Sequence, residues 1–205
     1  MRGSPHRLDA VQLRVLGCLI EKQRTTPDQY PLTLNSLRLA CNQSTARDPV
    51  VSYSEDEVRE AVQRLGHIGW TRLATGPGSR VAKYRQLFDE ALGLDGQETA
   101  LLALLMLRGP QTLGELKTRS ERLARFGDVG EVTETLARLG EKELAHLLPR
   151  RPGQREERWT HLLGDGPTEA EPEAGEAASL ERRIARLEQQ LQELERALAE
   201  RGLLG

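Results

Sequence analysis

Lysine and arginine side chains gather in two segments of this chain, each built around a Gly/Pro tip. The segments are 71–87 and 145–163, and their cations are Arg72, Arg80, Lys83, Arg85, Arg150, Arg151, Arg155 and Arg158. Cationic side chains on exposed tips can neutralise phosphates, so these residues are predicted DNA contacts. A solvated strand edge guarded by charge explains the same residues without DNA. The sequence leaves both interpretations open.

A second group of polar residues lies in a long segment at 41–54. Asn42, Gln43, Arg47 and Asp48 are hydrogen-bonding side chains close together in sequence, and Pro49 disfavours helix at the residue before it. They could fix the loop through an Arg47–Asp48 pair or a backbone network. Alternatively, they form a binding site for a partner or a phosphate.

No catalytic or metal-binding pattern accompanies these groups. The four histidines, His6, His67, His146 and His161, have no carboxylate at metal-ligand spacing. The Gly-rich segment at 76–79 lacks the phosphate-loop motif and reads as a turn. Cys18 and Cys41 form no CxxC motif, and Cys18 falls on the apolar face of a helix. We therefore expect a non-enzymatic protein with no cofactor, with reduced cysteines, in the cytoplasm.

The elements that must position these groups form a two-fold internal repeat, at about 8–88 and 94–163. Each copy begins with Leu-Asp and an apolar helix, then a short segment opening with Thr and Leu. A third, amphipathic segment ending in Arg-Leu-Gly follows, and two strand-like pieces around the basic tip close the copy. Three helices, a strand, a turn and a strand are the order of a winged helix-turn-helix domain.

The third segment of each copy should be a helix with an acidic beginning. Capping pairs mark helix starts at Ser54/Glu57, Asp95/Glu98, Thr112/Glu115 and Asp128/Glu131. The apolar stripes are Val58, Val62, Leu65 and Ile68 or Gly69, and then Val132, Leu136 and Leu139. The exposed starts carry Glu55, Asp56, Glu57 and Glu60, and then Asp128, Glu131 and Glu134, offset only by Arg59, Arg64 and Arg138. Phosphate would be repelled there, although a winged helix normally places this helix in the major groove.

Charge is uneven along the 205 residues. The net charge is −2 overall, with +3 for 1–93, −1 for 94–165 and −4 for 166–205. The first repeat is therefore the better candidate for an anionic partner. No apolar run reaches the roughly 20 residues of a spanning helix.

The last 40 or so residues differ from the repeats. Residues 164–179 are rich in Gly, Pro, Ala and Glu, which predicts a flexible acidic linker. Within 180–201 the apolar positions alternate at spacings of four and three residues: Leu180, Ile184, Leu187, Leu191, Leu194 and Leu198. This heptad pattern predicts a coiled-coil helix and a homodimer, the alternative being a helix that docks back on its own domains.

One family resemblance covers roughly 8–163. The residues that carry it are Glu21, Lys22, Thr26, Pro27, Tyr30, Pro31, Leu32, Leu34, Asn35, Cys41, Asn42, Gln43, Arg47, Asp48, Pro49 and Val50. In this pattern the chain resembles the YceH-like family of bacterial proteins. The resemblance implies a tandem winged-helix fold without an established activity.

Together these features predict a mainly α fold with small β-wings. We expect a first winged-helix domain at 1–93, a second at 94–163, the linker and the coiled-coil helix. The first functional hypothesis is a regulator that binds DNA through the basic wings and the 41–50 loop. The second is a protein–protein interaction adaptor that uses the same modules without DNA.

Overall fold

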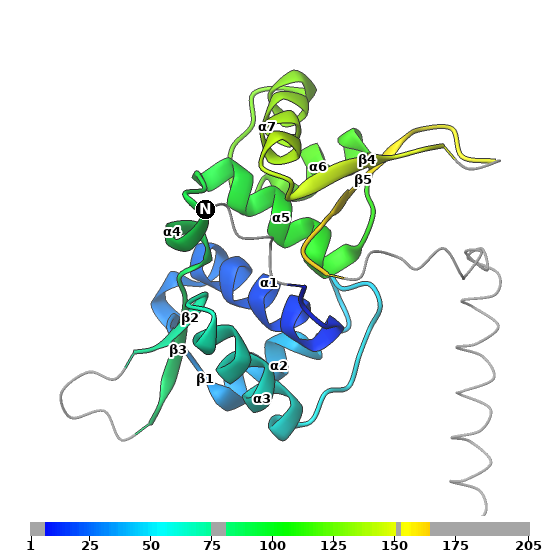
Figure 1. Cartoon of the computed structure of the whole chain (residues 1–205). Coiled ribbons are helices and arrows are strands. Elements are labelled where there is room, and N and C mark those ends of the chain that lie inside the picture. The colour runs from blue at the N-terminus through cyan, green and yellow to red at the C-terminus, as the bar shows by residue number, and fades with distance from the viewer. Residues whose placement is uncertain (1–6, 75–80, 151–152, 165–205) are drawn as a thin grey trace, which may run out of the picture. The chain divides into compact units, whose positions relative to one another are not determined.

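The computed structural model describes residues 7–74, 81–150 and 153–164. Over these residues the protein is mainly helical, with seven α-helices and two small antiparallel sheets (Figure 1). The predicted cations Arg80 and Arg151 lie outside the described residues, as do the coiled-coil helix and nearly all of the linker.

The first repeat contains three helices and a small sheet. Its elements are α1 (Ala10–Thr25), a 3₁₀ turn (Pro27–Gln29), β1 (Leu32–Thr33), α2 (Leu34–Cys41), α3 (Glu55–His67), β2 (Thr71–Leu73) and β3 (Lys83–Gln86). The sheet order is β1-β3-β2, and both pairings are antiparallel.

The second repeat has the same order with a simpler sheet. A short helix, α4 (Phe88–Leu92), connects the repeats, and α5 (Gly96–Arg108), α6 (Leu113–Ser120), α7 (Val129–Glu141), β4 (Ala145–Leu148) and β5 (Arg158–His161) follow. Strands β4 and β5 pair antiparallel, with Leu147 opposite Trp159. The order of elements predicted from the sequence is therefore present in both copies.

The helices begin where the capping residues predict. Full capping boxes form at Ser54/Glu57, Asp95/Glu98 and Thr112/Glu115, where each side chain bonds the other residue's backbone N–H. Asp128 caps α7, but the Glu131 carboxylate accepts from Gln97 and Gly127 instead of completing the box. The chain also has a box that we did not predict, between Asp9 and Gln12 at the start of α1.

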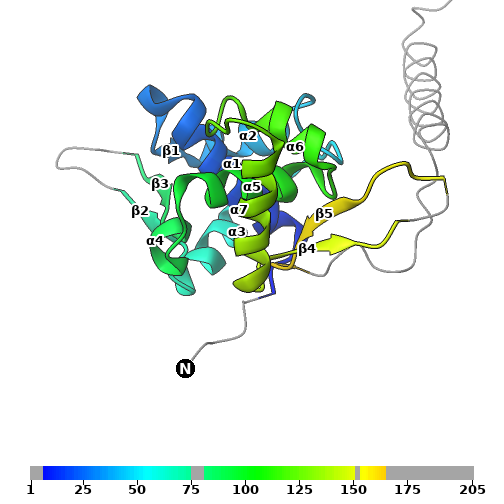
Figure 2. The ribbon, with the colours of Figure 1, turned by 90° about the horizontal axis from the view of Figure 1, so that it is seen from above.

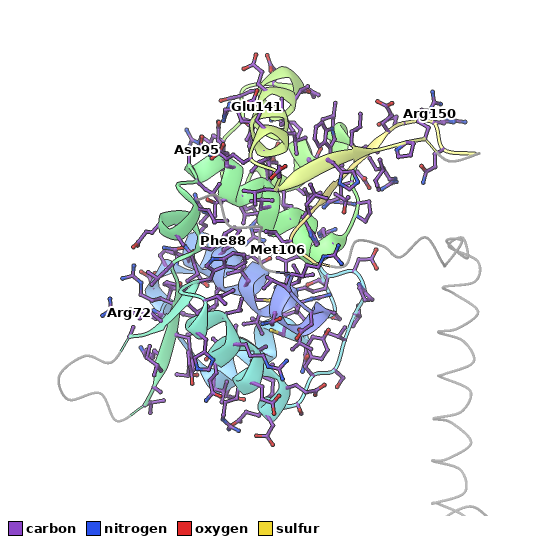
Figure 3. All side chains as sticks on the ribbon, in the orientation of Figure 1. Arg72, Phe88, Asp95, Met106, Glu141 and Arg150 are labelled. Carbon is purple, nitrogen blue, oxygen red and sulfur yellow. The ribbon has the colours of Figure 1, made fainter. Side chains whose placement is uncertain are left out.

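The buried apolar side chains of the described residues form one cluster that runs through both repeats. The predicted stripes of α3 and α7 are buried within it except at the last position of the first stripe: α3 ends at His67, Ile68 is only partly buried and Gly69 is exposed. The Tyr84 and Trp159 rings pack against the cluster. Phe88 meets Trp70 edge to face, with ring centroids 4.9 Å apart. Figure 3 shows Phe88 and Met106 in the middle of the molecule, between the two repeats.

Helices α1 and α5 pack closely at the centre of this core (Figure 1). Gly17 permits the approach: a Cβ there would lie 2.9 Å from Leu107 Cγ and 3.4 Å from Met106 Cβ. Close packing of this kind leaves no room for one more carbon without a shift. Both repeats belong to one compact unit, Met1–Gly166. The boundary between 93 and 94 stays a prediction from the sequence.

The two ends of this unit are joined by backbone. The Leu8 N–H donates to the Leu163 carbonyl at 2.7 Å, and Leu8 forms a parallel bridge with Gly164. The first residue of the first repeat is thereby tied to the end of the second. The two hairpins, β2–β3 and β4–β5, extend on opposite sides of the helical core (Figures 1 and 2).

Candidate functional site

The first hairpin carries its cations on one face. Arg72 and Arg85 are direct cross-strand partners, and Lys83 is two residues before Arg85. Residues opposite each other, and residues two apart on a strand, share a face of the sheet. Thr71, Gln86 and Leu32 occupy the other face and are buried. The cationic face therefore points away from the core.

The three cations differ in whether a carboxylate of the fold pairs with them. Arg85 donates to the Glu90 carboxylate at 2.8 Å. Arg72 is exposed, and in the described part of the chain neither Arg72 nor Lys83 has a carboxylate within ion-pair distance. Like charges placed directly opposite each other destabilise a hairpin. Because no carboxylate among the described residues holds Arg72, its guanidinium is available to an anion.

The arginines of the second hairpin are less available to an anion than Arg72 is. Arg158 donates to the Pro110 carbonyl at 3.0 Å and to Glu115 at 3.1 Å, which ties β5 to α6. Arg150 donates to the Gln154 carbonyl at 3.1 Å, across the base of the tip. Arg155 is exposed, but the exposed carboxylates of Glu156 and Glu157 follow it. Arg72 and Arg150 lie at opposite sides of the molecule (Figure 3).

The third helices present neutralised or acidic surfaces. On α3, Arg59 pairs with Glu55 and Asp56, and Arg64 pairs with Glu60 and Asp9. On α7, Arg138 pairs with Asp95 and Glu98 at the start of α5. Every arginine that the sequence offered as an offset to the acidic starts is therefore already paired. These helices favour cationic or neutral partners over phosphate.

The 41–54 loop is held to the core chiefly by Arg47. Its guanidinium bonds Glu21 twice, with Nη1 to Oε1 at 3.0 Å and Nη2 to Oε2 at 2.6 Å. It also donates to the Ala40 and Ala46 carbonyls and to the Gln43 side chain. The Arg47 side chain is wholly buried. The Arg47–Asp48 pair considered from the sequence is replaced by this pair with Glu21.

The remaining loop residues complete the network. The Asn42 side chain pairs with the Tyr53 backbone, donating to its carbonyl and accepting from its N–H, both at 2.8 Å. The Asp48 backbone N–H donates to the Leu107 carbonyl at 2.9 Å, so the loop touches the end of α5 in the second repeat. The Asp48 side chain is exposed and adds a negative charge there. The geometry favours the structural interpretation of this loop.

Electrostatics at the loop agree with a buried ion pair. Burial opposes the charged form of Glu21, but the hydrogen bonds and charge of Arg47 outweigh burial and lower the pKa of Glu21. Arg47 is likewise opposed by burial, yet Glu21 raises its pKa. Both groups therefore stay charged throughout the neutral range.

Sequence reasoning missed Glu21 and Arg14 as partners of the loop. Arg14 is 4% exposed and donates from Nη2 to the Pro49 carbonyl at 2.7 Å. Both residues lie on α1, more than 20 residues from the groups that they hold. A signal was present, because a charge beside the buried run 15–20 of an apolar helix calls for an opposite charge or a carbonyl partner.

The described residues contain neither a metal-binding cluster nor a membrane-spanning helix. Within residues 7–74, 81–150 and 153–164, no three His, Cys, Asp or Glu side chains gather in a way that could hold a metal ion. In the same ranges, no helix has both the length and the apolar character needed to span a bilayer.

Fold and site together define a mainly helical protein of two repeats, with acidic third helices and one outward cationic hairpin face. A family model described as "Protein of unknown function, DUF480" matches residues 8–154. The chain belongs to this family. The YceH-like resemblance stated from the loop motif is thereby confirmed.

Relatives in the same family align over nearly the whole chain. The chain is 44% identical over 212 residues to a UPF0502 protein of Dechloromonas aromatica (strain RCB), covering 98% of this chain and 99% of the relative. It is 48% identical over 204 residues to a UPF0502 protein of Stenotrophomonas maltophilia (strain R551-3), covering 91% and 94%. A UPF0502 protein of Pseudomonas fluorescens (strain SBW25) is 45% identical over 205 residues, covering 92% and 94%.

Proposed function

We propose that this protein is a non-enzymatic tandem winged-helix protein that binds the DNA backbone through the hairpin of its first repeat. Each repeat is a winged helix-turn-helix domain in this proposal, with the hairpin as its wing. The protein acts as a regulator in the cytoplasm, where bacterial DNA lies. The C-terminal heptads make it a homodimer, which would present two such hairpins.

The register of the first hairpin carries the proposal. Arg72 and Arg85 are direct partners, and Lys83 shares their outward face. Glu90 offsets the charge of Arg85 alone, so the fold does not compensate Arg72 for facing a like charge, whereas a phosphate could bind it. Arg80 extends this set in sequence. The contact is made to backbone rather than base edges, so binding should depend little on DNA sequence.

The loop and the third helices have other roles in this proposal. Arg47 is buried against Glu21 and cannot reach a ligand without breaking that pair. Helix α3 uses both of its exposed arginines within the fold. The loop is therefore not part of the proposed DNA contact, and its role in this proposal is to hold α1, α2 and α5 together.

A protein–protein adaptor is the alternative, and the acidic helices favour it. The exposed surfaces of α3 and α7 would suit a cationic protein better than a nucleic acid. Leu39 of α2 is 55% exposed and would supply apolar contact area. In this case the hairpin cations would only guard a strand edge.

The experiment is fluorescence anisotropy of the full-length protein with labelled duplexes at low salt. Two duplexes of unrelated sequence are expected to bind with similar affinity, and binding should weaken steeply as salt rises. Absence of binding to either duplex at low salt would end the DNA proposal and leave the adaptor.

A further inference from the structure

The outer edge of β2, in the first hairpin, is open. The order β1-β3-β2 places this strand at the edge of its sheet. Between β2 and β3, the Ala74 N–H donates to the Lys83 carbonyl and the Leu87 N–H donates to the Trp70 carbonyl, both at 2.8 Å. Because hydrogen-bonded and non-hydrogen-bonded pairs alternate in an antiparallel pairing, Leu73 directs its N–H and C=O away from β3. Among the described residues, no hydrogen bond to these two groups is formed.

The side chain at this open edge is apolar. Leu73 shares a face of the sheet with Tyr84, its partner on β3, and with Leu32 beyond it on β1. Leu32 is buried and Tyr84 packs against the core, but Leu73 is 54% exposed. The edge therefore offers both backbone hydrogen bonds and apolar contact to a further strand.

The second hairpin has the equivalent edge, but a proline protects it. Leu147 occupies in β4 the position that Leu73 has in β2, because the backbone bonds at the start of the two hairpins match. Pro149 follows two residues later and has no N–H to donate to a further strand. The corresponding residue of the first repeat is Thr75, which has one. Of the two equivalent edges, the one in the first repeat is thus better able to pair.

A second copy of the same strand fits this edge. Two identical strands that pair antiparallel are related by a two-fold axis perpendicular to their sheet, so one edge can be its own partner. With the axis between the two Leu73 residues, each leucine exchanges N–H···O=C bonds with the other. Arg72 then lies opposite Ala74 of the second copy instead of another arginine. The pairing therefore sets no like charges directly opposite each other across the new boundary, and both cationic faces point the same way.

The charges of the hairpins oppose this pairing in the free protein. Pairing brings Arg72, Lys83 and Arg85 of both copies onto one continuous face, and among the described residues only Arg85 of this set has a carboxylate partner, Glu90. One short strand from each copy also buries less than the about 1,000 Å² that a stable interface needs. Phosphates bound to these cations would remove the repulsion.

We infer that two copies bound to one duplex join their first hairpins edge to edge, β2 against β2, into one sheet whose cationic face lies on the DNA. The inference rests on the proposed DNA binding and adds the partner of that site, which is a second copy of this chain. The duplex neutralises both hairpins and holds them close together. Binding of one hairpin to DNA thereby favours binding of the next.

The test is a disulfide between copies in a full-length Leu73→Cys variant. Hydrogen-bonded partners in an antiparallel sheet have Cα atoms about 5.5 Å apart, which a disulfide can span. The reduced protein is oxidised with diamide at low salt, with and without a duplex long enough for two hairpins, and separated on a non-reducing gel. We expect a several-fold higher yield of covalent dimer with the duplex. Cys18 and Cys41 are fully buried, so the natural chain should give none.

Leu147→Cys is the matched control, because Leu147 is exposed at the equivalent position of the second hairpin. Its yield of covalent dimer should not rise with the duplex. Fluorescence anisotropy of the same samples measures DNA binding. Lack of binding by the natural chain would end the proposed function and this inference together. Binding without a DNA-dependent covalent dimer of Leu73→Cys, or an equal rise in Leu147→Cys, would overturn this inference alone.

A second variant tests the edge without a cross-link. Leu73→Lys places a charge on the open edge, which opposes strand pairing, and adds a cation that can only favour phosphate. It should bind the long duplex more weakly than the natural chain does, but not a duplex short enough for one hairpin. Undiminished binding to the long duplex would contradict pairing through β2.

Discussion

The Arg47 guanidinium holds the Glu21 carboxylate with two hydrogen bonds, and the shorter is 2.6 Å. The pair joins the loop to α1, and the same loop reaches the end of α5 through the Asp48 backbone. One residue of the first repeat thus organises a segment that touches the second. The 41–54 loop, the segment that most distinguishes the first repeat in sequence, therefore helps to hold the two repeats together.

Arg47→Ala should lower the free energy of unfolding by about 3–5 kcal/mol. Removing one partner leaves the Glu21 carboxylate buried without its counter-ion. Urea denaturation measures the change. Arg59→Ala is the matched control, because it removes an exposed arginine paired with Glu55 and should cost about 0–1 kcal/mol. Equal small losses in the two variants would show that the loop network contributes little.

Gly17→Ala should destabilise the protein by about 1–3 kcal/mol, because the new Cβ would lie 2.9 Å from Leu107 Cγ. Gly114→Ala in α6 is expected to have the opposite effect and to stabilise the protein. A Cβ there has nothing within 4 Å, so the variant should gain about 0.5–1 kcal/mol from helix propensity. Thermal unfolding measures both effects: the melting temperature should fall in Gly17→Ala and rise in Gly114→Ala. A stable Gly17→Ala protein would mean that α1 and α5 can move apart at no cost.

His161 should make the protein less stable in mild acid. Burial lowers its pKa to about 4, and the neighbouring His146 adds to this effect. The unfolded chain therefore takes up a proton first as pH falls below about 6.5. The free energy of unfolding should not depend on this group above that pH. Below it, the free energy of unfolding should fall by roughly 1.4 kcal/mol per pH unit toward pH 4.

His161→Asn removes the titrating group while retaining a side-chain acceptor for the Leu163 N–H. Urea unfolding at pH 7.5 and pH 5 should show a loss of about 2 kcal/mol in the natural chain and a smaller one in the variant. His67→Asn, at an exposed histidine, should behave as the natural chain does. An equal pH dependence in all three proteins would contradict the assignment.

Local features of the fold were predictable because they depend on neighbours in sequence. Ser54 and Glu57 are three residues apart, so one helical turn brings them together wherever the helix goes. The stripe of Val58, Val62 and Leu65 needs only the helical period to identify its buried side. The short strand β1 and helix α4 were missed because they are too brief to show a period.

The site was harder to predict because its contacts are long-range. Arg47 and Glu21 are 26 positions apart, and no local pattern distinguishes Glu21 from the neighbouring Asp48 as the partner. The outward face of Arg72, Lys83 and Arg85 followed from alternation once the strands were known. Their register did not, because the tip at 75–80 could close in more than one way.

The tail prediction concerns residues outside the described ranges. In the predicted coiled coil, the heptad side chains would be buried only against another helix. Ending the chain after Gly166, or Leu191→Asp in the full chain, should therefore shift the mass in solution from dimer to monomer. Light scattering measures it, with circular dichroism as the check that both variants remain folded. An unchanged mass would assign the interface to the repeats, or make the tail a helix that folds back.

The salt dependence of DNA binding tests the central proposal most directly. A variant with Arg72→Gln and Lys83→Gln should flatten the plot of log affinity against log salt by roughly 1.8, which is about 0.9 for each lost phosphate contact. A variant with Arg59→Gln and Arg64→Gln changes the net charge equally, but on α3, and should keep the slope of the natural chain. An unchanged slope in the hairpin variant, or equal flattening in the α3 variant, would contradict binding through the first hairpin.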